Sequence, residues 1–279
     1  MTAADRALRI VYLYPGLLGR YGHQGDALVL CQRCLARGVD AELITVAPGD
    51  AVPQQADLYL LAAGESAGLL TLSVLLQQQR HLLKAVDRGA VLFAVGVALP
   101  LLGTCLISHT GEMIAGLGVL DFESRLVRER RFGPVVGDPL LPIDGPLLGF
   151  EDHHLSVRLG AGLCPLASLR LGAGQGGQQH REGVWRHHVV GTSLRGPVLA
   201  LNPALADWLL SQLLGPLPPL PMLAVDRLRE RFLCGLPPRI GSTARRCIHA
   251  NADSAGWRDC WFPVWREGHR RWSAGAAFG

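Results

Sequence analysis

The sequence has almost no lysine and few charged residues for its length. Of its 27 basic residues only Lys84 is a lysine, and charged residues make up 18% of the chain against 49% hydrophobic residues. This balance excludes a disordered, highly charged chain and is typical of a globular protein with a sizeable core. No uninterrupted apolar run reaches the roughly 18 residues of a transmembrane helix, and the first residues lack the small-residue cleavage site of a signal peptide. We therefore expect a cytoplasmic protein without a membrane span.

Cysteine is present at seven positions, and free thiols are the default in a cytosolic chain. Cys31 and Cys34 form a C-x-x-C in a stretch that resembles an amphipathic helix, where a spacing of three places both thiols on one face. This favours core packing over a redox or zinc role. Cys247, His249 and Cys260 leave a metal site open, although their spacing matches no common zinc module. We expect no metal and no cofactor.

Arginine and tryptophan gather at the C-terminal end. From Leu223 onward there are ten arginines and five acidic residues, and four of the six tryptophans. An Arg/Trp-rich segment can bind nucleic acid or an anionic surface, and the alternative is a weakly packed C-terminus. Because residues Gly235 to Gly279 show neither helical nor strand periodicity, we favour the weakly packed tail and expect no nucleic-acid partner.

Strand-like and helix-like stretches alternate through the first 105 residues. The expected strands are LRIVYLYP from Leu8, AELITVA from Ala41, ADLYLLAAG from Ala56 and the run Val91–Val95, with helices over Asp26–Arg37 and Ala67–Arg88. This rhythm predicts an α/β fold with a mainly parallel sheet and helices on both faces. Beyond Gly111 the strands become short and closely spaced, which predicts an antiparallel portion.

The end of the expected domain has a clear signature. The stretch NPALADWLLSQLL predicts a closing helix with Asn202 as its N-cap and Pro203 at its first position. A Pro-rich segment, GPLPPLPM, then begins at Gly215. We expect one domain over residues 8–214, followed by a Pro-rich linker and an Arg/Trp-rich tail over residues 215–279.

The stretch GAVLFAVGVALPLLGT, from Gly89 to Thr104, predicts a strand that turns sharply into a helix beginning near Leu99. Many α/β enzymes display a nucleophile at such a turn. At its apex this chain has Gly96, which has no side chain with which to do chemistry.

A resemblance to a known family covers about Ile10 to Leu214. It rests on YPGLLGRYGHQGDALVLCQR, ADLYLLAAGES, AVGVALPLLGT, IAGLGVLDFES, LLGFEDHH and VVGTSLRGPVLALNPALADWLL, in family order and at family spacing. The chain resembles the GatD family of class I glutamine amidotransferase subunits, which implies a flavodoxin-like fold. In that family the subunit hydrolyses glutamine and passes ammonia to MurT, a Mur-ligase-like partner. MurT then amidates a glutamate of the peptidoglycan stem peptide on lipid II.

The resemblance also implies where the site lies. Gly96 occupies the position of the family's nucleophilic cysteine, and Arg195 occupies that of its histidine base. The family's glycine-rich oxyanion loop aligns with Ala62–Ser66, where only Gly64 of three glycines is kept. Arg130 aligns with an arginine that contacts glutamine. An arginine stays protonated near neutral pH and cannot act as a base.

Two classes of function remain open. The first is a working glutaminase subunit with rerouted chemistry. The second is a non-catalytic member, either a scaffolding or regulatory subunit of a MurT-like ligase or a decaying paralogue; such a member could still bind glutamine. The paired loss at Gly96 and Arg195 favours the second class.

Substitute catalytic groups are few. On the expected helix Cys105 would lie two and a half turns beyond Gly96, about 13 Å along the axis and too far to replace the nucleophile. His109, His153 and His154 are candidate bases by number only. Asp26 is expected to be a helix N-cap rather than a site residue.

Overall fold

The computed structural model describes residues 6–18, 24–63, 68–176, 180–221 and 223–236. The chain separates into two compact units, Met1–Glu230 and Arg231–Gly279. All elements below lie in the first unit except the end of the last helix. The boundary that the sequence predicts between residues 214 and 215 stays a prediction.

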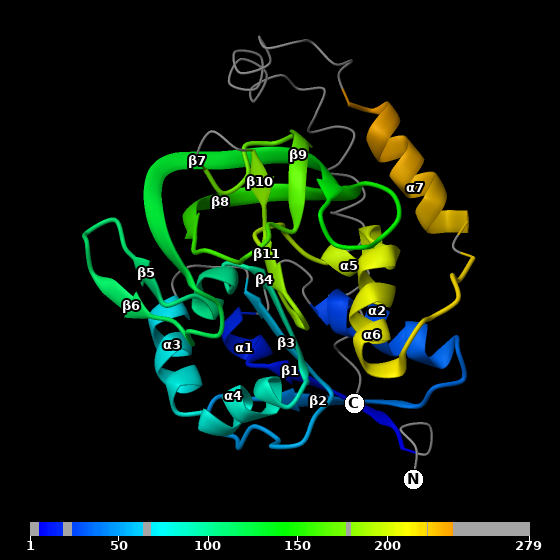
Figure 1. The fold of residues 1–279 in the computed structure, drawn as a ribbon, viewed down its shortest axis with the longest axis horizontal. Helices are drawn as coiled ribbons and strands as arrows, with labels where there is room; N and C mark the ends of the chain where they lie inside the picture. Colours follow the sequence, from blue (N-terminus) through cyan, green and yellow to red (C-terminus); the bar gives the residue numbers. More distant parts are fainter. Residues whose placement is uncertain (1–5, 19–23, 64–67, 177–179, 222, 237–279) are drawn as a thin grey trace, which may run out of the picture. The chain divides into compact units, whose positions relative to one another are not determined.

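Six strands form a mainly parallel sheet in the order β11-β12-β4-β3-β1-β2 (Figure 1). They are β1 (Leu8–Leu13), β2 (Ala41–Val46), β3 (Leu58–Ala63), β4 (Val91–Gly96), β11 (Val184–Arg186) and β12 (Val189–Thr192). All neighbours run parallel except β11 and β12, which form an antiparallel pair. The expected α/β fold is confirmed.

Helices cover both faces of this sheet because its inner strands are apolar on both faces. One face carries α2 (Gln24–Leu35), α5 (Val198–Leu201) and α6 (Pro203–Leu214), and the other carries α3 (Leu69–Gln77) and α4 (Arg80–Asp87); a short α1 (Pro15–Leu18) follows β1 (Figure 1).

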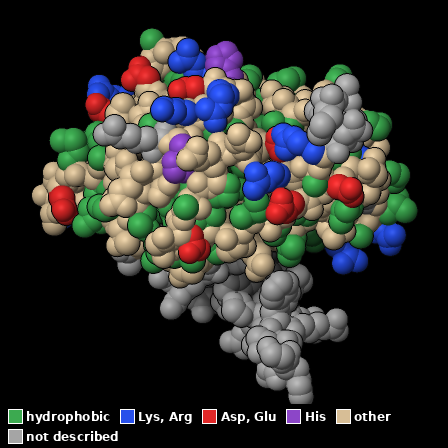
Figure 2. All heavy atoms as spheres, turned by 90° about the horizontal axis from the view of Figure 1, so that it is seen from below, with side chains coloured by type: hydrophobic (Ala, Val, Ile, Leu, Met, Phe, Trp, Pro, Cys, Tyr) green, Lys and Arg blue, Asp and Glu red, His purple; other side chains and the backbone are tan. Residues whose placement is uncertain are grey.

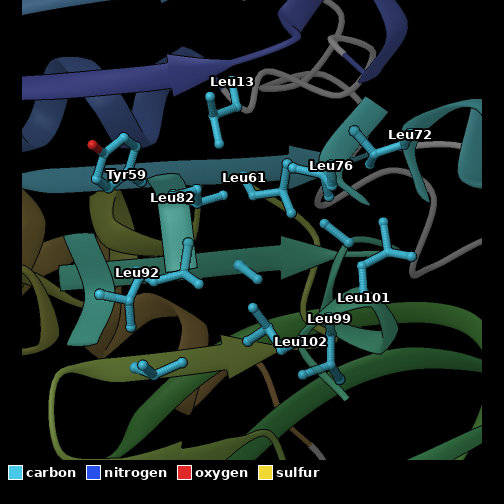
Figure 3. Close-up of a cluster of buried hydrophobic side chains, with 14 of the residues drawn as sticks. Leu13, Tyr59, Leu61, Leu72, Leu76, Leu82, Leu92, Leu99, Leu101 and Leu102 are labelled. Atoms are coloured by element: carbon cyan, nitrogen blue, oxygen red, sulfur yellow. The ribbon is translucent and has the colours of Figure 1, made fainter. Parts of the chain in front are cut away.

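Alternate residues of β4 serve the two faces. Phe93 is fully buried in the cluster that contains Leu30 of α2 and Leu209 of α6. Leu92 points to the opposite cluster, which also contains Leu72 of α3 (Figure 3). Burying each such side chain contributes about 1.5–3 kcal/mol, so this strand is held from both sides.

The single helix that the sequence predicts over Ala67–Arg88 is wrong, because the structure breaks it into α3 and α4. Gln79 leaves the helical region, with φ −95° and ψ 58°. Leu76 and Leu82 both pack in one core cluster (Figure 3). Six residues of a continuous helix turn through about 600°, which would place these two leucines on different faces. The break lets both reach the core.

The second half of the domain forms a largely antiparallel sheet, as expected. Its order is β10-β9-β7-β5-β6, with β8 also paired to β7 (Figure 1). The strands are β5 (Cys105–Ile107), β6 (Met113–Ala115), β7 (Phe122–Pro139), β8 (Leu147–Leu159), β9 (Ala167–Leu171) and β10 (Arg181–Glu182). Only β5 and β7 run parallel. The long β7–β8 ribbon carries both Arg130 and His153.

Helix α7 (Leu223–Cys234) follows the Pro-rich segment. Arg229 of this helix donates hydrogen bonds to the main-chain oxygens of Leu201 and Pro146, at 2.6 and 2.7 Å. No helix among the described residues is long and apolar enough to cross a membrane. On the face in Figure 2, basic side chains lie interspersed with acidic ones rather than in one patch. The expectations of a cytoplasmic location and of no nucleic-acid partner stay predictions.

Candidate functional site

The candidate site lies where three neighbouring parallel strands end. Ala63 of β3 is the register partner of Gly96 in β4, and Val95 is the partner of Thr192 in β12. The segments after these strands therefore emerge at one edge of the sheet, which is where ligands bind in open α/β folds. Gly64 lies outside the described residues.

Gly96 has the backbone of a sharp strand-to-helix turn. Its φ is +68°, in the left-handed region that costs other residues roughly 1–2 kcal/mol. It is buried and ends β4. A strained turn of this kind exposes a nucleophile in other α/β folds. Here the turn is present without a nucleophilic side chain.

The helix that the sequence predicts after this turn is only a four-residue 3-10 turn, Leu99–Leu102. It ends because the chain comes close to β7. A Cβ on Gly103 would meet the main-chain oxygen of Phe122 at 2.5 Å, and Thr104 N–H donates to that oxygen at 2.9 Å. Cys105 consequently begins strand β5. Its predicted place on a helix is wrong, and it belongs to the second sheet.

Arg130 and Arg195 meet at Asp152 of β8. Arg130 Nε donates to Asp152 Oδ1 at 2.7 Å, and Arg195 Nη2 donates to the main-chain oxygen of the same residue. The Arg195 N–H also donates to the carbonyl of Phe150 at 2.8 Å, which ties the segment after β12 to β8. The structure therefore brings together two residues that lie 65 positions apart in the sequence.

A buried polar array fixes Thr192 and Ser193, the two residues at the end of β12 that lead to Arg195. Glu182 of β10 is fully buried and accepts hydrogen bonds from Thr192 Oγ1 at 2.7 Å and from Ser193 N and Oγ at 2.7 and 2.6 Å. Burial raises the pKa of Glu182, although these hydrogen bonds lower it. His153 Nε2 lies 3.1 Å from Ser193 Oγ. The array holds the end of β12 in one register.

Ser193, His153 and Glu182 contain the residue types of a hydrolase triad but not its geometry. His153 Nδ1 accepts the Leu155 N–H at 3.1 Å, so Nε2 carries the proton and faces Ser193 as a donor. Ser193 is 1% exposed, and its hydroxyl group donates its hydrogen bond to Glu182 Oε2. In this arrangement His153 cannot take a proton from Ser193, and the three residues are structural.

Burial lowers the pKa of His153 to about 3, helped by the charges of Arg131 and Arg195. His153 is therefore neutral at physiological pH. The other two candidate bases lie elsewhere: His109 is exposed and packs edge-on against His154, whose Nδ1 lies 3.2 Å from the carbonyl oxygen of Val127. Among the described residues, no hydrogen bond joins any of these three histidines to Gly96.

Asp26 is not the N-cap that the sequence predicts. It lies in the first turn of α2, is fully buried, and accepts the Leu199 N–H of α5 at 2.7 Å. Its Oδ2 has no hydrogen-bond partner within the described part of the chain. Burial raises the pKa of Asp26 to about 7, which the Leu199 and Val198 N–H groups partly offset. Asp26 thus links α2 to the segment that follows Arg195.

The thiols of α2 pack as expected. Cys34 is fully buried and Cys31 packs against the same cluster. Burial raises the pKa of both thiols, that of Cys34 to about 11, so neither is a nucleophile at neutral pH. The hypothetical metal ligands Cys247, His249 and Cys260 lie outside the described residues.

Sequence reasoning missed Glu182 and Ser193, and it treated Asp152 only as part of a motif. Glu182 lies in a two-residue strand, so no periodicity marks it. The one local signal was that Thr192 and Ser193 continue the apolar strand β12 with hydroxyl groups, and a buried hydroxyl needs a partner.

Comparisons with known proteins point to one family. Residues 9–203 match the model of the CobB/CobQ-like glutamine amidotransferase domain. A relative from Staphylococcus aureus, the GatD subunit of glutamine-hydrolysing lipid II isoglutaminyl synthase, is 24% identical over 209 residues, covering 74% of this chain and 84% of its own. The subunit of the same name from Streptococcus pneumoniae is 26% identical over 205 residues, covering 71% and 77%.

Solved structures share the fold. The glutaminase domain of a Trypanosoma brucei CTPS with bound acivicin aligns with a TM-score of 0.52 and 12% identity, over 77% of this chain and 97% of that domain. At this identity the likeness concerns the fold alone.

Proposed function

We propose, from the premise that the chain belongs to the CobB/CobQ-like glutamine amidotransferase family, that it is a GatD-like subunit that has lost glutamine hydrolysis. The relatives named above support a subunit of lipid II isoglutaminyl synthase. The loss is inferred from the candidate site itself.

The observation that carries the proposal is Gly96. It keeps the positive φ of a nucleophile turn, at the end of β4, beside the strand that leads to Arg195. Amide hydrolysis needs a nucleophile and a base to activate it. Gly96 has only a hydrogen atom where the nucleophilic side chain is needed, and Arg195 has a permanent cation where the base is needed. Replacing a base costs about 10²–10⁴-fold, before the loss of covalent catalysis is counted.

A working glutaminase with another nucleophile is the competing function. Within the described residues, Cys105 lies in the second sheet, and Ser193 is buried and donates a hydrogen bond to Glu182. Cys31 and Cys34 lie on α2 and pack in the hydrophobic core. We infer that none of these four side chains stands in for the missing nucleophile at Gly96. We therefore favour a scaffolding or regulatory subunit over a rerouted enzyme.

The partner that fits this function is a MurT-like Mur ligase. A non-catalytic subunit would still dock on the ligase while supplying no ammonia. The decaying-paralogue alternative predicts that docking is lost as well, so binding to the ligase separates the two.

The test is co-expression of the full chain with a MurT-like ligase, followed by amidation assays on the purified complex. We expect a stable complex whose amidation requires added ammonium and does not proceed with glutamine. Amidation driven by glutamine would contradict the loss of hydrolysis. Failure of the two chains to co-purify would contradict the scaffolding role and favour a decaying copy. A catalytically intact GatD serves as the positive control.

A further inference from the structure

The turn that follows β9 (Gly172–Gln175, the β9 turn) closes around a buried carboxyl group. Glu151 of β8 is 2% exposed, and its two oxygens accept the N–H groups of Ala173 and Gly174 at 2.6 and 2.8 Å. Successive backbone N–H groups that point into one concavity form a binding site for an anion. Here the protein's own side chain fills that site, so the turn is fastened to β8 by a group that can gain or lose a proton.

Two glycines allow the β9 turn to approach both of its neighbours closely. Gly172 and Gly174 have φ values of +111° and +64°, in the left-handed region. A Cβ on Gly172 would lie 3.3 Å from Oε1 of Glu151, and one on Gly174 would collide with the main-chain oxygen of Arg181. The N–H of Gln175 donates to that same oxygen at 3.0 Å. One end of the turn is therefore held by main-chain groups, which do not titrate, and the other by Glu151.

Two charged groups on neighbouring strands act on Glu151. Glu182 of β10 is a second buried carboxyl group and raises the pKa of Glu151, because two like charges disfavour each other. Arg131 of β7 lowers that pKa. The guanidinium of Arg131 donates its hydrogen bond to the main-chain oxygen of Leu155. One cation and one anion thus oppose each other, and burial decides the protonation of Glu151.

His153 lies beside Glu151 without adding a charge. Its Nε2 is 3.7 Å from Glu151 Oε2, and burial lowers the pKa of His153 to about 3, so the ring is neutral at physiological pH. On β9, Arg170 is ion-paired with Asp138 at 3.0 Å. After β12, Arg195 acts on His153, whose pKa it lowers.

The protonation of Glu151 is linked to the closure of the β9 turn. Burial raises the pKa of Glu151 from 4.5 to about 7, which the N–H groups of Ala173 and Gly174 partly offset. If the turn moves away, the carboxyl group meets water and its pKa returns toward the ordinary value. The closed turn therefore binds a proton more tightly than the open turn, so opening becomes easier as the pH rises from about 4.5 to about 7 and then levels off.

We propose that Glu151 makes the β9 turn a pH-sensitive clamp, which stays closed while the carboxyl group keeps its proton and opens more readily once that proton is lost. A charged carboxylate is costly to keep in so buried a place, and opening hydrates it. The clamp also reaches the end of β12, because His153 lies between Glu151 and Ser193, with its Nε2 3.1 Å from Ser193 Oγ. This device does not depend on whether the chain hydrolyses glutamine.

The experiment is amide hydrogen exchange of the full chain, followed residue by residue by NMR between pH 5 and pH 8. After correction for the pH dependence of intrinsic exchange, the protection of the Ala173 and Gly174 amides should fall by about 10- to 100-fold over this range, with most of the fall below pH 7. The amide of Thr104 donates to the main-chain oxygen of Phe122 in the same half of the domain and should show no such fall.

Two variants assign the effect to one carboxyl group. Glu151→Gln does not titrate and offers one acceptor oxygen to two N–H groups, so protection of the turn should be lower at pH 5 and constant with pH. Glu129→Gln is the matched control, because it makes the same exchange at an exposed glutamate of β7 and should leave the fall unchanged.

A fall in protection that persists in Glu151→Gln would overturn the proposal, and so would constant protection in the unmodified chain. An equal fall at Thr104 would show unfolding of the whole domain rather than a local clamp. If Glu151→Gln does not fold, the carboxyl carbon of Glu151 in the unmodified chain decides: its NMR shift should titrate near pH 7, and a midpoint near the ordinary value of 4.5 would contradict the clamp.

Discussion

Replacing Glu182 with alanine is expected to lower the free energy of unfolding by about 3–5 kcal/mol. The carboxylate accepts three hydrogen bonds from Thr192 and Ser193 in a fully buried site. Without it, three donors are left unpaired, and each costs about 1–3 kcal/mol when buried. A loss of this size is a large fraction of the stability of an ordinary domain.

Urea unfolding followed by circular dichroism measures this change. Glu112→Ala is the matched control, because the same exchange at an exposed residue should leave stability within about 0.5 kcal/mol. A loss below about 1 kcal/mol for Glu182→Ala would mean that the array does not hold the end of β12.

Replacing Asp26 with asparagine is expected to stabilise the protein at about pH 8, and to have an effect that shrinks as the pH falls and is small near pH 3. The pKa of Asp26 rises from 3.8 to about 7 on folding. The folded state therefore binds a proton more tightly than the unfolded state, and stability from this group falls as pH rises through that window. Above pH 7 Asp26 is charged in both the folded and the unfolded state, and the folded state bears the full cost of burying that charge.

Asparagine does not titrate, and its Oδ1 can still accept the Leu199 N–H. About three pKa units correspond to at most ~4 kcal/mol, and imperfect packing of the amide reduces this. The measurement is the difference in unfolding free energy between variant and unmodified protein at several pH values, which cancels the titration of Glu151 and His153. A difference that is constant with pH would show that Asp26 ionises as it does in the unfolded chain.

The sequence pattern predicted the first sheet well because the information there is local. Strand β4 is a continuous apolar run, and a run buried on both faces predicts a parallel strand whatever surrounds it. The same reasoning failed at Ala67–Arg88, where one helix was expected. The break is needed because Leu76 and Leu82 pack in the same core cluster. That packing is a tertiary contact, which the local sequence pattern does not indicate.

The candidate site was predictable only as far as the family resemblance reached. The turn at Gly96 followed from its motif, and its positive φ agrees with that interpretation. The partner of Asp26 was not predictable, because Leu199 lies 173 residues away. Glu182 and Ser193 are brought to His153 by two sheets that meet at β8 and β12, and no spacing in the sequence encodes that meeting.

The most direct test of the central claim is glutamate release from L-glutamine by the full-length chain, assayed with and without a MurT-like partner. We predict no release above the uncatalysed background, and no change on substituting Arg195→Gln. Turnover of about 0.1 per second, some tenfold or more below ordinary enzymes, would be readily detected. Turnover at that level, abolished by Arg195→Gln, would contradict the account and show that this edge of the sheet is a working glutaminase site.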